Sequence, residues 1–363
     1  MIEKSLLKNI DWILISLLLI NSVIGVVAIY SSSYHIQGNY FIKQMIWIFI
    51  SFIVLILLLS IDYKILVMYS LYFYILLIAI LGGLLVLGSL LGTNKSWINF
   101  SIVSIQPSEL TKIGIILLMA YLFSNYRKDY ISWKKGSVSV LIFIIPFILV
   151  ALQPDLGTAI SYISILLAVF ILAGMRRNLI IFLLLLVMIV GLVGWNFYLK
   201  DYQKQRISTF IFPGKDPLGS SYHILQSKIS IGSGGFFGKG YIKGTQSQLK
   251  FLPARHTDFI FSVIGEEFGF IGVFFIIIIY SFFILRLFNS VNKSRDRTGV
   301  YLVFMIAMLI SFQFFINVFM VIGLFPITGI PLPLLSYGGS SILTNYIALS
   351  LVLNVKMRRF VNV

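Results

Sequence analysis

Three side chains suited to acid–base and anion chemistry, Arg255, His256 and Asp258, stand within four residues of one another. They close a long hydrophilic segment, residues 200–261, and an apolar run follows directly. A carboxylate at the edge of hydrocarbon is costly and is usually paired or functional. Asp258 is therefore the strongest candidate for a functional acid, and Arg255 and His256 would keep it ionised. The alternative is structural: an N-cap or first-turn carboxylate that the helix dipole stabilises.

Two further acidic groups, Glu109 and Asp155, each follow a Gln-Pro pair at the start of an apolar run. Pro suits the first helical position, and an acid in the first turn suits the helix dipole. Glu109 and Lys112 are spaced i, i+3 on one helix face and can form an ion pair. For that pair, substrate binding and helix stabilisation are equally open. Asp155 fits an N-cap better than a ligand, although it stays a substrate-binding candidate.

The hydrophilic segment 200–261 is basic, and Arg206, Lys239 and Arg255 are its candidate anion ligands. Such a surface attracts anions, while the alternative is contact with lipid headgroups. Lys239 lies in the glycine-rich stretch 232–240, which has neither a Walker loop nor a dinucleotide fingerprint. A flexible loop is the favoured interpretation of that stretch. Its backbone N–H groups could also bind a phosphate.

Composition places these residues on a membrane protein. The chain has 363 residues, of which 59% are hydrophobic and 11% charged, against about 25% charged in a soluble domain. About ten helices fit this length, so we expect one membrane domain over 1–363 with an external loop at 200–261. The net charge of +16 sits mostly in short gaps between apolar runs, which favours membrane topology over nucleic-acid binding. The absence of Cys excludes disulfides and thiol chemistry.

The fold class expected is an all-α polytopic membrane protein. Apolar runs predict ten transmembrane helices, at about 11–30, 44–60, 65–91, 107–125, 137–153, 154–174, 179–199, 262–288, 299–324 and 341–355. Between the last two, residues 325–340 are rich in Pro and Gly. Irregular backbone at membrane depth occurs where it is buried in protein or lines a cavity, so this stretch is predicted to form a cavity wall.

Lys and Arg residues in the short loops predict the orientation. With the N-terminus inside, the inside segments hold 16 Lys and Arg residues, whereas the short outside loops hold Lys43 and Lys95. Long loops cross largely regardless of charge, so the segment 200–261 does not oppose this assignment. Both termini are therefore expected in the cytoplasm and the long loop outside it.

Together these motifs resemble the SEDS family (shape, elongation, division and sporulation) over nearly the whole chain. The motifs that carry the resemblance are Gln106 to Lys112, Gln153 to Thr158, Arg206 with Pro213 and Asp216, Gln226 to Gly240, Leu252 to Phe261 with Glu266 to Gly269, and Gly329 to Ser341. The resemblance implies ten helices in the bacterial cytoplasmic membrane and peptidoglycan glycosyltransferase activity on lipid II. It places the essential acid at Asp258 and implies a class B penicillin-binding protein as partner. One departure is Lys95-Ser96, where the family usually has two basic residues.

The chemistry of such a reaction suits the candidate residues. Glycosidases need two carboxylates because their leaving alcohol requires an acid, but polyprenyl pyrophosphate leaves readily if a cation stabilises its charge. Asp258 could then act alone as the general base toward the acceptor sugar 4-hydroxyl. Arg206, Lys239 or Arg255, with or without a divalent cation such as Mg²⁺ or Mn²⁺, would hold the pyrophosphate.

Two other functions remain open from the sequence. One is a lipid II flippase, in which Glu109, Lys112 and broken helices would serve alternating access. The other is a polymerase of another polyprenyl-linked glycan. Within the family, the short tails favour the elongation type, and the sporulation type stays open.

Overall fold

The protein is almost entirely helical in the computed structural model, which describes residues 8–34, 39–90, 96–100, 103–126, 130–175, 181, 204, 208–212, 220–249, 251–252 and 254–359. The helices are α2 (Trp12–Ser33), α3 (Tyr40–Ser60), α4 (Tyr63–Met68), α5 (Ser70–Leu90), α6 (Pro107–Phe123), α7 (Trp133–Leu152), α8 (Leu156–Ala173), α11 (Ser220–Ser233), α12 (Thr245–Gln248), α13 (Ile260–Asn292), α14 (Arg297–Val321) and α15 (Gly339–Met357). Strands β1 (Ile98–Phe100) and β2 (Val103–Ile105) pair antiparallel, with Ile98 opposite Ile105.

Seven of the described helices are long and apolar enough to cross a membrane: α2, α3, α5, α7, α8, α13 and α14. The chain is therefore a membrane protein, as predicted. α6 and α15 are more polar, and almost all their residues are buried against the other helices. Their Ser, Thr and Asn side chains are thus mostly buried in protein and not exposed to lipid, as polar groups in a bilayer require.

Nine of the ten predicted helices coincide with described helices to within a few residues. The seventh, predicted at 179–199, falls almost wholly outside the described residues. The third, predicted as one helix over 65–91, divides into α4 and α5 at Tyr69.

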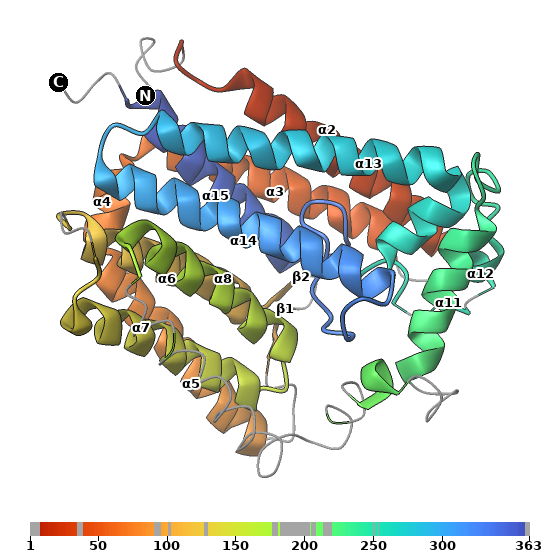
Figure 1. Ribbon diagram of the computed structural model, residues 1–363, viewed down its shortest axis with the longest axis horizontal. Helices are drawn as coiled ribbons and strands as arrows, with labels where there is room; N and C mark the ends of the chain where they lie inside the picture. The colour runs from red at the N-terminus through yellow and green to blue at the C-terminus, as the bar shows by residue number, and fades with distance from the viewer. Residues whose placement is uncertain are drawn as a thin grey trace.

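The bundle has two distinct ends (Figure 1). α2 begins and α15 ends at one of them, while α11 and α12 lie at the other. At the first end the Asp11 carboxylate joins three helices, because it accepts from Arg286 of α13 at 2.8 Å and from Lys356 of α15. Since α13 runs the length of the bundle, its beginning lies beside α11 and α12 (Figure 1).

The glycine-rich stretch 232–240 is not the flexible loop that its composition favoured. It packs directly on the first turns of α13, where a Cβ on Gly234 would lie 2.0 Å from the Gly265 carbonyl oxygen. Gly238 has φ +81°, and a Cβ on it would lie 2.1 Å from the Glu267 carbonyl oxygen. The glycines therefore serve close backbone contact between two segments, which composition alone does not distinguish from flexibility.

Candidate active site

A cavity of about 650 Å³ contains three of the predicted site residues, Glu109, Asp155 and Asp258. Its wall is built from α3, the β1–β2 strands, the starts of α6 and α8, the turn before α13, and the stretch between α14 and α15. The volume falls within the roughly 300–1,000 Å³ typical of sites for small organic ligands. The predicted contribution of the Pro/Gly-rich stretch is confirmed, because Gly329 and Pro331 line the cavity.

Asp258 is half-buried in a turn that precedes α13. The turn closes on Ala254, whose φ is +48° and whose carbonyl oxygen accepts from the Asp258 N–H at 3.0 Å. The N-cap position of α13 is Phe259, one residue later, so Asp258 is not the N-cap of this helix. Its carboxylate lines the cavity instead.

Two buried polar side chains fix this turn to the cavity wall. The Asn317 amide of α14 donates to the Asp258 carbonyl oxygen at 3.0 Å and to the Ile330 carbonyl oxygen at 2.8 Å. The Ser336 hydroxyl donates to the Thr257 carbonyl oxygen at 2.6 Å. Since Asn317 and Ser336 are almost fully buried, these bonds hold the backbone under Asp258 in a water-poor setting, where lost partners are costly.

His256 also lines the cavity, beside two tyrosine rings. Its ring centroid lies 4.5 Å from that of Tyr40 and 5.7 Å from that of Tyr337, and its carbonyl oxygen accepts from the Tyr337 N–H at 2.9 Å. Burial, with a smaller contribution from the Arg255 charge, lowers the pKa of His256. His256 is therefore favoured as neutral imidazole beside Asp258.

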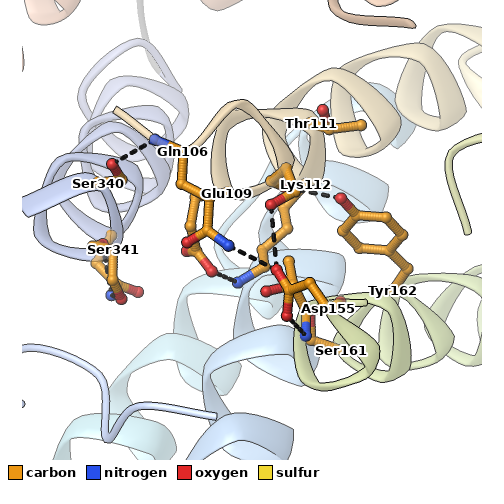
Figure 2. Close-up of polar contacts among 12 residues, drawn as sticks. Gln106, Glu109, Thr111, Lys112, Asp155, Ser161, Tyr162, Ser340 and Ser341 are labelled. Atoms are coloured by element: carbon orange, nitrogen blue, oxygen red, sulfur yellow. Dashed lines mark hydrogen bonds and ion pairs between the residues drawn. The ribbon is translucent and has the colours of Figure 1, made fainter. Parts of the chain in front are cut away.

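The predicted Glu109–Lys112 ion pair is confirmed (Figure 2), and both residues are buried. Lys112 Nζ lies 2.6 Å from Glu109 Oε1, and the side chains of Lys112 and Glu109 are 1% and 4% exposed. Glu109 lines the cavity, whereas Lys112 is buried and is not among the lining residues. Nearby, the buried Tyr162 hydroxyl donates to the Ser108 carbonyl oxygen at 2.7 Å. A charge so deeply buried requires its partner, so the pair stabilises the first turns of α6, to which both residues belong.

Asp155 is the N-cap of α8, as predicted, and it connects a second helix as well. One carboxylate oxygen accepts from the Thr158 N–H at 3.2 Å and the other from the Gln106 amide at 2.5 Å (Figure 2). The Gln106 N–H in turn donates to the Ser340 hydroxyl at the start of α15. Three helices, α6, α8 and α15, therefore begin side by side at the cavity.

Two of the predicted basic ligands, Lys239 and Arg255, do not line the cavity. Lys239 pairs with the buried Glu266 at 2.8 Å and donates to Thr245, away from the lining. Arg255 is 2% exposed and is also absent from the lining, and burial lowers its pKa. Arg206 lies outside the described residues. Glu266 and the neighbouring Glu267 are both buried, and Glu267 accepts from Ser31 of α2, so both serve contacts between segments.

Lys43 is a cation of the cavity that the sequence did not single out. Its side chain is exposed on the first turn of α3, and Trp47, one turn further on, also lines the cavity. In the sequence Lys43 counted only as an external loop charge. The i, i+4 spacing of Lys43 and Trp47 indicates that the two side chains share one face of a helix. The packing of α3 on α15 determines that this face meets the cavity, and the sequence does not show that packing.

A family model covering FtsW, RodA and SpoVE, described as cell cycle protein, matches residues 11–360. The chain belongs to this family. The chain is similar to the peptidoglycan glycosyltransferase MrdB of Escherichia coli strain K12, to which it is 38% identical. The match covers 79% of this chain and 78% of that protein. Stage V sporulation protein E of Bacillus subtilis strain 168 is 34% identical, with 95% and 96% covered. The peptidoglycan glycosyltransferase RodA of Treponema pallidum is 30% identical, with 97% and 98% covered.

Solved structures show the same FtsW/RodA/SpoVE fold. A chain of a peptidoglycan synthase complex that coordinates polymerization and crosslinking matches with a TM-score of 0.82 and 27% identity, over 97% of this chain and 98% of that one. The crystal structure of the rod shape determining protein RodA of Thermus thermophilus matches with a TM-score of 0.72 and 26% identity, over the same shares of the two chains.

Proposed function

We propose that this chain is a peptidoglycan glycosyltransferase that polymerises lipid II into glycan strands for cell-wall elongation, with Asp258 as its general base. The observation that carries the assignment of the base is the position of Asp258. Its carboxylate lines a cavity of about 650 Å³ in a chain of the FtsW/RodA/SpoVE family. Relatives named peptidoglycan glycosyltransferase supply the reaction class.

In this reaction Asp258 accepts the proton of the acceptor sugar 4-hydroxyl as its oxygen attacks the anomeric carbon of the donor. The new C–O bond forms on the face opposite the leaving group, so an α linkage becomes β. Polyprenyl pyrophosphate departs with the electron pair of the broken bond. One carboxylate suffices because the leaving pyrophosphate needs a cation and not a proton.

Among the basic candidates, geometry favours Lys43 for the pyrophosphate, since it lines the same cavity as Asp258. Lys239 has no such support because it is paired with Glu266. Arg206 stays a candidate ligand of the pyrophosphate. Arg255 also stays a candidate, although its charge would act on the pyrophosphate from outside the cavity lining. Glu109 and Asp155 line the cavity as acceptors for substrate hydroxyl or amide groups.

A divalent cation, Mg²⁺ or Mn²⁺, belongs to the proposal. No group of three His, Asp or Glu side chains in the described part of the chain is arranged to hold a metal. Mg²⁺ is often bound by only one or two carboxylates together with substrate phosphates, and Asp258 at the cavity fits that donor set. The ion would supply charge neutralisation of the pyrophosphate. Loss of polymerisation on chelation, restored by Mg²⁺ or Mn²⁺, tests it.

The proposed setting is the bacterial cytoplasmic membrane, with ten helices, both termini in the cytoplasm and the segment 200–261 outside. Asp258 and Asp11 lie at opposite ends of α13, because Asp258 precedes its first turn and Asp11 pairs with Arg286 near its last turn. This arrangement supports placing Asp258 on the side of the membrane opposite the N-terminus. A class B penicillin-binding protein is the proposed partner. The similar chain in a synthase complex that coordinates polymerization and crosslinking supports this pairing.

The test is lipid II polymerisation by the purified protein with its penicillin-binding partner, wild type against Asp258→Asn. Moenomycin is present to silence contaminating glycosyltransferases of another class. We expect glycan chains from the wild type and none from an equally folded Asn variant. A variant that still polymerises would place the base elsewhere, with Glu109 and Asp155 next in line. A variant that loses polymerisation but keeps translocating lipid II in vesicles would separate the enzyme from the flippase alternative.

A further inference from the structure

A second, smaller pocket of about 180 Å³ lies where α4, the start of α14 and the end of α15 meet. It shares no lining residue with the cavity around Asp258. Its charged lining residues are one carboxylate and four cations: Asp296, Lys64, Arg295, Arg358 and Arg359. Four positive charges against one negative give the lining a formal charge of +3. A concave surface of this kind concentrates anions.

Asn354 holds the pocket in shape by joining α15 to the end of α3. Its amide nitrogen donates to the Leu58 carbonyl oxygen at 2.8 Å and to the Ile61 carbonyl oxygen at 2.5 Å. Its amide oxygen accepts from Arg358 Nε at 2.9 Å. Asn354 is fully buried, so these bonds fix α15 against the end of α3 and orient Arg358 before any ligand arrives.

The single carboxylate of the lining is already engaged within the protein. Asp296 Oδ1 accepts from the Tyr63 hydroxyl at 2.8 Å and from the Gly299 N–H at 3.1 Å, and it thereby caps α14. These bonds hold Asp296 in a structural role, and its negative charge is already counted in the net +3 of the lining.

Among the cations, Arg358, Lys64 and Arg295 have weak ion pairs or none within the described residues. Arg358 is only loosely paired with Asp62, at 3.6 Å. Within the described residues, the exposed side chains of Lys64 and Arg295 form no ion pair. The pocket therefore combines a frame held by Asn354 with a net positive charge.

We propose that this pocket binds a phosphate group at the membrane surface. A volume of about 180 Å³ is below the roughly 300–1,000 Å³ of sites for whole small molecules, so it suits one ionic group. The ligand is a phosphate-bearing anion, and an acidic phospholipid headgroup and free inorganic phosphate are its two sources. Basic pockets between transmembrane helices bind such headgroups at the cytoplasmic side. The pocket lies at the end of the bundle where α15 ends.

The experiment uses the full-length purified protein in mixed micelles and follows its thermal unfolding midpoint. The probes are phosphatidylglycerol against phosphatidylcholine, and inorganic phosphate against chloride at equal ionic strength. The pocket variant is Lys64→Gln with Arg295→Gln. The matched control is Lys134→Gln with Lys293→Gln, which removes the same charge from exposed lysines that do not line the pocket. The single variants Lys64→Gln and Arg295→Gln accompany it in case the pair disturbs folding.

Phosphatidylglycerol is expected to raise the midpoint of the wild type and of the control more than phosphatidylcholine does. The pocket variant should bind it roughly 30-fold more weakly and show a correspondingly smaller midpoint shift, because each of the two lost cations contributes about 1 kcal/mol of attraction to an acidic lipid. The single variants should lose part of the shift. A shift with inorganic phosphate as well would identify the phosphate itself as sufficient, and a shift with the lipid only would identify the headgroup. Equal losses in pocket variant and control, or no preference for either anion in the wild type, would overturn the proposal.

Discussion

At the scale of single residues, the cavity depends on buried charges that tolerate little change. Glu109 and Lys112 are almost fully buried and lie 2.6 Å apart. Removing one partner of a buried ion pair leaves an uncompensated charge in a medium of low polarity and costs about 3–5 kcal/mol. Removing both leaves no charge to compensate. The pair therefore provides a test of structure that is distinct from the base role proposed for Asp258.

We expect Lys112→Met alone to destabilise the protein by about 3–5 kcal/mol, and the double variant Glu109→Gln with Lys112→Met to recover much of that loss. Unfolding in detergent, followed by tryptophan fluorescence, measures both. The single variant Glu109→Gln is measured as well. If the loss in the double variant equals the sum of the losses in the two single variants, the two side chains do not interact directly.

His256 provides a pH prediction at the same scale. Its pKa in the folded protein is lowered from 6.5 by burial and by Arg255. Below pH 6.5 the unfolded chain therefore binds a proton that folded His256 does not, and the free energy of unfolding falls as pH falls. Above pH 6.5 neither state binds that proton and the effect is absent.

The unfolding midpoint of the wild type should therefore decline between pH 6.5 and 5, and that of His256→Gln should decline less. Circular dichroism melting curves at constant ionic strength measure the difference. Parallel declines in both proteins would assign the slope to other groups.

At the scale of elements, periodicity and composition predicted where nine helices lie, because long apolar runs leave few alternatives. They also predicted that Glu109, Asp155 and Asp258 begin or precede helices, since acids and Pro mark helix starts. They did not predict that Lys43 faces the cavity, or that the stretch 232–240 packs on α13. Both depend on contacts between segments far apart in sequence, which no local pattern contains.

Gly157, in the first turn of α8, shows such a contact. A Cβ at this position would lie 2.2 Å from the carbonyl oxygen of Thr328, next to the cavity-lining Gly329. Gly157→Ala should therefore displace the cavity wall, cost about 1–3 kcal/mol as overpacking does, and lower the polymerisation rate.

The matched control is Gly82→Ala in the middle of α5, where a Cβ meets nothing within 4 Å. Because Ala favours helix over Gly by about 0.5–1 kcal/mol, this variant should be as stable as the wild type or more so. Melting temperature and initial rate are measured for both variants. Equal behaviour of the two would refute the close approach of α8 to the wall.

At the scale of the whole molecule, one carboxylate joins the first and last helices of the described chain. Asp11 caps α2, accepting from the Leu14 N–H at 3.3 Å, and it binds Arg286 and Lys356. Asp62 also caps a helix, through the Lys64 N–H at 2.9 Å, but its ion pair is longer and more exposed. The two acids thus share a capping role and differ in the burial of their charge.

Asp11→Asn should cost about 3–5 kcal/mol, because it leaves two cations without their shared anion. Asp62→Asn should stay within about 1 kcal/mol, as expected of an exposed pair. Denaturant unfolding of the two variants, at low salt and high salt, gives the comparison. Similar losses would mean that capping and not charge burial determines the stability here.

The three helices that begin side by side at the cavity have an electrostatic consequence. One lysine and three carboxylates give the side chains of the lining a formal charge of −2, which disfavours a pyrophosphate. Each helix N-terminus, however, carries the equivalent of roughly half a positive charge, so α6, α8 and α15 together oppose that field with about 1.5 charges. Backbone dipoles cannot be titrated or removed by a side-chain substitution. These dipoles therefore offset most of the negative charge of the lining and reduce its repulsion of an anionic group such as the proposed pyrophosphate.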